Sequence, residues 1–168
     1  MLTRQEQWIK WSLYAAAIAL LTLAYLLTLR DVRVLGVRFF LPPLIVGVVA
    51  SMEGPRAGMI FGMCYGALSD LALPGAFPCV YTLSFAAAAL LCAALAESVL
   101  QPRVICSVAA TLLTFAVTDA LQMLSLAVTD HAGALTMLSI AVREAAISCG
   151  MLFAVHPVLM YLHKRFVL

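Results

Sequence analysis

Four charged residues lie inside long apolar stretches of this sequence, where a charge is costly. They are Asp70, Asp119 and the adjacent pair Arg143 and Glu144. A charge near the centre of a bilayer costs at least about 2.5–3.5 kcal/mol on insertion scales. Their positions along the predicted helices place all four residues toward the outer third of a helical bundle. An ion pair between the arginine and a carboxylate there would offset part of the free-energy cost of removing these charges from water. We therefore predict an intramembrane polar cluster; the alternative is that each of these residues simply marks a helix end near the lipid head groups.

Motifs for catalysis or for metal binding are missing from the sequence. It contains no H-E-x-x-H metalloprotease motif and no G-x-S-x-G nucleophile elbow. The five cysteines form no C-x-x-C pair, and the three histidines do not cluster, so no metal or cofactor site is expected. Ser69 beside Asp70 fits neither the serine nor the aspartyl pattern of intramembrane proteases. We therefore expect a protein that is not an enzyme and that needs no cofactor.

A row of small residues precedes Asp70 on the same predicted helix. Gly58, Gly62 and Gly66 recur every four residues, and residues four apart lie on one helix face. In lipid the hydrophobic drive between helices is absent, so close van der Waals packing must hold helices together. The row therefore predicts a packing seam, either within the protein's own core or as a groove for a partner's helix.

The composition indicates what kind of elements position these residues. Of the 168 residues, 65% are apolar and 11% are charged, whereas soluble domains are usually about 45–50% apolar and about 25% charged. The net charge of +2 is too balanced to suggest nucleic acid as a partner. These values argue against a soluble enzyme, a disordered tail and a secreted disulfide scaffold. They favour a single polytopic membrane domain over residues 1–168, with the lipid bilayer as its solvent.

Apolar stretches of about the length that crosses a bilayer, about 20 residues, divide the chain into six predicted helices. The helices cover residues 11–29, 39–52, 57–73, 79–96, 104–129 and 134–162. The second is short for a span, so five spans are the alternative. The last is too long for one span, and we expect a short segment before about residue 143, then a span that Pro157 kinks. The predicted fold class is an all-α integral membrane bundle of six transmembrane helices, or five.

The orientation follows from the basic residues, because cytoplasmic loops carry an excess of lysine and arginine. With six helices and the N-terminus inside, the inner segments hold six basic residues and the outer loops hold three. The inner six are Arg4, Lys10, Arg56, Arg103, Lys164 and Arg165, and the outer three are Arg30, Arg33 and Arg38. We therefore predict that both termini lie in the cytoplasm.

Several of these features together resemble the rod shape-determining protein MreD family. The resemblance is specific over the stretch from Phe39-Phe-Leu-Pro-Pro through Met52-Glu-Gly-Pro and the glycine row to Asp70-Leu71. The final His156-Pro157 and the basic Lys164-Arg165 also have counterparts in that family. Phe77-Pro78 and the pair Arg143 and Glu144 depart from the family pattern.

The resemblance implies a non-enzymatic component of the bacterial cell-elongation machinery in the cytoplasmic membrane. Such a protein supports cell shape and lateral peptidoglycan synthesis. The implied partners are a single-span MreC-like protein and the complex of MreB, the RodA glycosyltransferase and a class B penicillin-binding transpeptidase. The implied mechanism is helix docking, with Gly58, Gly62 and Gly66 as the groove or its support. A homodimer remains open.

An alternative function comes from the similarity of MreD proteins to S components, the six-helix substrate-binding subunits of energy-coupling-factor vitamin transporters. Ala15-x-x-x-Ala19 is a small-residue pair of the kind that S components use to dock their transport subunit. A vitamin site needs polar and aromatic groups that converge in a cavity, and the predicted outer loops contain few aromatic residues. The elongation scaffold is therefore preferred, and the S component is the alternative.

Overall fold

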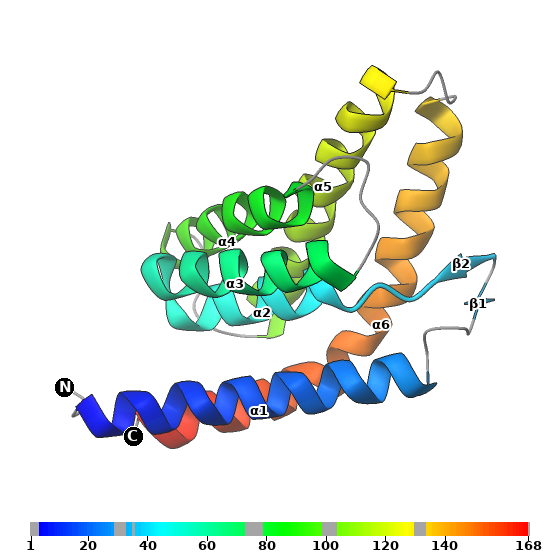
Figure 1. The fold of residues 1–168 in the computed structure, drawn as a ribbon. Coiled ribbons are helices and arrows are strands. Elements are labelled where there is room, and N and C mark those ends of the chain that lie inside the picture. Colours follow the sequence, from blue (N-terminus) through cyan, green and yellow to red (C-terminus); the bar gives the residue numbers. More distant parts are fainter. Residues whose placement is uncertain are drawn as a thin grey trace.

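Six α-helices make up almost all of the described structure, a computed structural model (Figure 1). The structure describes residues 4–28, 33–34, 36–72, 79–98, 104–129 and 134–167. The helices are α1 (Arg4–Thr28), α2 (Pro42–Glu53), α3 (Pro55–Ala72), α4 (Val80–Ser98), α5 (Val104–Thr129) and α6 (Ala134–Val167). A two-residue hairpin, β1 (Arg33–Val34) and β2 (Val37–Arg38), precedes α2. The predicted all-α fold is confirmed.

Three of the helices are long and apolar enough to cross a membrane. The candidate spans are Gln7–Thr28, Ile105–Leu124 and Leu138–His163. Two further apolar helices, Pro42–Glu53 and Val80–Ala96, are shorter. The described helices therefore form an all-α membrane bundle, and the choice between six and five complete spans stays a prediction.

The helices are arranged around a layer in which α2, α3 and α4 lie side by side (Figure 1). Helix α5 packs against α2 and α4, and α6 packs against α5 and α2 before it turns to run beside α1. Both termini lie at the same end of the molecule (Figure 1). Helix α6 is bent (Figure 1) and contains Pro157, the residue predicted to kink it. A proline inside a helix removes a backbone hydrogen bond and crowds the preceding turn.

The boundaries of two predicted elements need correction. Helix α1 begins at Arg4, well before residue 11, so Lys10 lies inside the helix, and its side chain is buried within the bundle. Helix α6 is continuous over Ala134–Val167, so the predicted short segment before residue 143 and the span that follows it belong to one helix. The predicted turns at 74–78 and 130–133 lie outside the described residues.

The short second helix is explained by its position at the centre of the bundle. Every residue of α2 from Pro42 to Ser51 is buried, because α3, α4, α5 and α6 all pack around it. A helix that is surrounded by protein is apolar on all faces and does not need the length of a lipid-facing span. It ends at Gly54, whose φ of +81° suits glycine, and α3 begins directly at Pro55.

The glycine row of α3 is an internal packing seam. A Cβ atom added at Gly62 would lie 2.7 Å from the carbonyl oxygen of Phe85, and one added at Gly66 would lie 2.6 Å from the Cα atom of Thr82. Gly58 meets the backbone of α2 in the same way, at 2.9 Å. The backbones of α4 and α2 therefore fill this groove. Of the two predicted roles, the core seam describes the structure, and a groove open to a partner's helix at these glycines does not.

Replacing Gly62 with alanine is expected to destabilise the protein by about 1–3 kcal/mol, because the methyl group would push the α4 backbone away. Gly150→Ala is the matched control, since nothing lies within 4 Å of the added Cβ there and alanine favours a helix over glycine by about 1 kcal/mol. Thermal unfolding of both purified variants in detergent measures the difference. Equal melting temperatures would contradict the seam.

Candidate functional site

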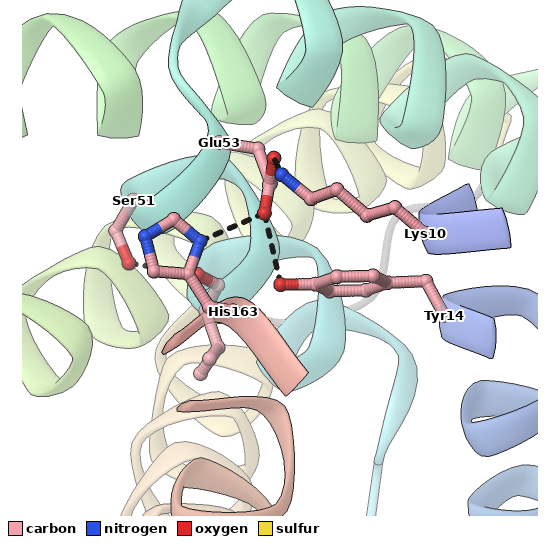
Figure 2. A network of polar contacts seen from close by, with 6 residues as sticks. Lys10, Tyr14, Ser51, Glu53 and His163 are labelled. Carbon is pink, nitrogen blue, oxygen red and sulfur yellow. Dashed lines mark hydrogen bonds and ion pairs between the residues drawn. The ribbon is translucent and has the colours of Figure 1, made fainter. Parts of the chain in front are cut away.

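The carboxylate of Glu53 joins three segments near the end of the molecule that holds the termini (Figure 2). Lys10 forms an ion pair with it, and the hydroxyl of Tyr14 donates a hydrogen bond over 2.9 Å, both from α1. From α6, Nδ1 of His163 lies 2.8 Å from the same carboxylate. The Glu53 side chain is only 6% exposed. This network ties α1 and α6 to the turn between α2 and α3.

The charge state of Glu53 is set by its partners. Burial alone would raise the pKa of Glu53, but the hydrogen bonds from His163, Lys10 and Tyr14 outweigh it and lower the pKa to about 2. The carboxylate is therefore ionised at any pH near neutrality. Lys10 and Glu53 are distant in the sequence, so only the folded structure reveals the pair.

Asp70 holds the start of α4. Its two carboxylate oxygens accept hydrogen bonds from the backbone N–H groups of Tyr81 and Thr82, over 3.0 and 2.9 Å, and from the Thr82 hydroxyl over 2.6 Å. The first N–H groups of a helix have no partner within the helix, and a negative charge is favourable there. Gly66 brings α3 against the same residues of α4. Asp70 is thus the polar end of the packing seam.

A cavity of about 1190 Å³ lies between α1 and α3. Its lining includes Ala15, Ala19 and Leu26 of α1, and Cys64 and Leu68 of α3. These five residues are exposed, so the cavity opens to the surface between the two helices. We call it the α1–α3 cleft.

The inner wall of the α1–α3 cleft is rich in aromatic rings. The aromatic lining residues are Tyr25, Phe39, Phe40, Phe61, Tyr65 and Tyr81. Two hydrogen bonds attach α1 beside this wall: Thr22 to the hydroxyl of Tyr65 over 3.0 Å, and Tyr25 to the carbonyl of Phe39 over 2.6 Å. Sequence reasoning missed this wall because its residues come from four segments that meet only in the folded chain.

Five polar side chains that are not aromatic line the same cleft: Thr22 from α1, Ser69 from α3, Asp119 and Gln122 from α5, and Glu144 from α6. Gln122 is hydrogen-bonded to the side chain of Tyr81. Arg143 is exposed and forms no ion pair within the described part of the chain. The predicted polar cluster is therefore corrected: Asp119 and Glu144 line the same cleft, Asp70 caps α4, and Arg143 is exposed and pairs with none of them among the described contacts.

Metal binding finds no support in this arrangement, since no three His, Cys, Asp or Glu residues among those described could hold an ion together. Known proteins also provide no assignment. No protein-family model, no curated protein and no solved structure matches the chain.

Glu53→Gln is expected to cost about 3–5 kcal/mol, because it leaves the buried ammonium of Lys10 without a counter-ion. The double variant Lys10→Met/Glu53→Gln should recover part of this loss, since methionine keeps the apolar stem and removes the stranded charge. Thermal unfolding of the two single variants and the double variant gives the coupling energy. If the two losses simply add, the ion pair does not hold α1 in place.

Proposed function

We propose that the protein is a non-enzymatic membrane scaffold that docks the transmembrane helix of a partner in the α1–α3 cleft. The observation that carries this proposal is the lateral opening of a large, mostly apolar cleft. A helix is about 10 Å wide and rises about 1.5 Å per residue, so a volume of 1190 Å³ corresponds to about ten helical residues. The cleft therefore has room for about half of a membrane-spanning helix.

The attachment of α1 also supports docking at this place. Only 11% of the α1 span is buried inside the protein, and polar contacts to Glu53, Tyr65 and Phe39 hold the helix at intervals along its length. Ala15 and Ala19 lie at the rim of the cleft, where small residues let a second backbone approach closely. These contacts thus fix α1 in position at the rim, and the cleft stays open.

The scaffold that we propose is of the MreD type, in the bacterial cytoplasmic membrane with both termini in the cytoplasm. It would dock an MreC-like single-span protein and act with MreB, RodA and the class B penicillin-binding transpeptidase in cell shape and wall elongation. The residues that carry the resemblance support this, because they build one structural unit. In this unit, Pro42 and Pro43 begin the buried α2, and Asp70 caps α4 at the end of the glycine seam.

A second candidate function, a vitamin-binding S component, is favoured by the lining of the same cleft. Aromatic rings and the polar groups of Asp119, Gln122 and Glu144 converge there, as they do in small-molecule sites. The scarcity of aromatic residues in the outer loops is therefore no argument against this function. A vitamin bound to the purified protein, together with an ATPase pair, would favour the transporter, and a co-purified single-span protein would favour the scaffold.

Ala19→Trp is expected to reduce the amount of co-purified MreC-like protein at least about tenfold and to round the cells, because the indole would occupy the cleft that docks the partner. Ala16→Trp is the matched control, since Ala16 is an exposed residue of α1 that does not line the cleft. Pull-down from membranes and microscopy of cells with the variant as sole copy test this. Normal outline and full partner retention with Ala19→Trp would contradict docking in the cleft.

A further inference from the structure

His156 is a buried imidazole to which the surrounding helices offer no hydrogen bond. It lies on α6 inside the candidate span Leu138–His163, and only 5% of the residue is exposed. Neither Nδ1 nor Nε2 has a hydrogen-bond partner in the described part of the chain. Buried polar atoms of this kind are few in folded proteins, and leaving them unpaired costs stability. The fold therefore gives up stability at this position, and the reason must lie in what the imidazole can do.

Contacts on both sides place His156 at the level of the middle of α2. Two turns before it on α6, the hydroxyl of Ser148 accepts a hydrogen bond from the N–H of Phe40, just ahead of α2. Two turns after it, His163 meets Glu53 at the last residue of α2. The middle of α2 between these contacts is buried and apolar. The imidazole thus lies in an apolar part of the core.

The charged groups at the end of α2 lie too far away to pair with His156. Helix α6 packs against α1, α2, α5 and β2. The ionisable groups that α1 and α2 contribute at this end, Lys10, Tyr14 and Glu53, all gather at His163. His163 follows His156 by two helical turns, about 10 Å at 1.5 Å per residue. These groups are therefore bonded to one another and not to His156.

The other charged groups lie toward the start of α6. Asp119 of α5 and Glu144 of α6 line the α1–α3 cleft, and Glu144 precedes His156 by about 18 Å along the helix. Strand β2 ends just before Phe40, which contacts Ser148, so β2 also lies on that side. The remaining titratable side chains described on these elements are exposed arginines or groups that are uncharged near neutral pH: Arg143, Arg165, Tyr25, Tyr161, Cys106 and Cys149.

A proton on His156 would therefore create a charge in an apolar place with no partner for it. Burying a charge without a partner is far more costly than burying a neutral polar group. In water, an imidazole takes up a proton at about pH 6.5. Acidification therefore favours any arrangement of α6 in which His156 reaches water.

Pro157, the next residue, provides a place where α6 can move. Proline has no N–H, so the helical hydrogen bond to the carbonyl of Phe153 is missing, and helices bend at such points. Helix α6 is bent, with its first part beside α5 and its last part beside α1 (Figure 1). The last part can therefore tilt about Pro157 while the first part stays packed.

We infer that His156 is a proton-sensitive switch: when its imidazole takes up a proton from water, the part of α6 after Pro157 moves away from α2 and hydrates the charge. At neutral pH and above, the imidazole is uncharged and α6 stays seated. Below about pH 6.5, the seated arrangement loses up to about tenfold in population per pH unit, because only the moved arrangement binds the proton. His163 and Glu53 join this part of α6 to α1, so the movement also loosens α1.

Double electron–electron resonance on the full-length protein in lipid nanodiscs, at about pH 8 and about pH 5, tests the switch. The three cysteines that are not buried are replaced by serine, and spin labels are placed at the exposed Leu83 of α4 and Tyr161 of α6. A second distance between these labels should gain at least about threefold in population at pH 5, and at most about thirtyfold for one proton. Labels at Leu83 and Leu138, which lies before the bend, should keep their distance.

Two variants assign the effect to one imidazole. His156→Leu and His156→Gln cannot take up a proton, so the change with pH should vanish in both. His163→Gln is the matched control, because it removes the other described imidazole of α6 and should leave the change in place.

An unaltered protein with the same Leu83–Tyr161 distances at both pH values would overturn the switch, and so would an equal change in His156→Leu. If neither variant at position 156 folds, nitrogen-15 spectra of the three labelled histidines decide the question in the otherwise unaltered protein. The signals are assigned through His131→Gln and His163→Gln. An imidazole of His156 that stays neutral at the pH where the distance changes would refute the inference.

Discussion

Helices α3 and α4 approach each other so closely that backbone meets backbone at Gly62 and Gly66, and the rest of the architecture depends on this contact. Because lipid provides no hydrophobic drive between helices, such close packing must supply the attraction. It commits one face of α3 to the core and leaves the opposite face, with Cys64 and Leu68, as a wall of the α1–α3 cleft. Asp70 secures the end of the same seam by capping α4.

Helix α1 is held differently, by a few buried side chains such as Tyr14 and Ile18 together with polar contacts along its length. Glu53 anchors it through Lys10 and Tyr14, and Thr22 is bonded to Tyr65 further along. A helix attached in this way stands off from α3 and leaves an apolar space that opens sideways. The stability of the core and the availability of the cleft therefore rest on separate sets of residues, so substitutions can test them separately.

Local patterns in the sequence predicted most of the helices and the seam, because apolar stretches, proline positions and the spacing of glycines act over a few residues. The Glu53 network and the cleft could not be predicted, because they join residues far apart in the chain. In the sequence, Lys10 has the position of a basic residue that flanks a membrane span at the membrane–water interface. Only the folded structure shows that its side chain is buried. The prediction that Arg143 and Glu144 join one cluster overlooked a local signal, because adjacent helical residues point about 100° apart.

Site-directed photo-crosslinking in living cells tests the central claim, that a partner's helix occupies the α1–α3 cleft, most directly. A photoreactive residue at Leu68, which lines the cleft, is compared with one at Leu71, which is exposed on the same helix but outside the cleft. The account predicts a strong crosslink to a single-span protein from position 68 and little from position 71. Crosslinks to lipid alone from position 68, or equal protein crosslinks from both positions, would contradict it.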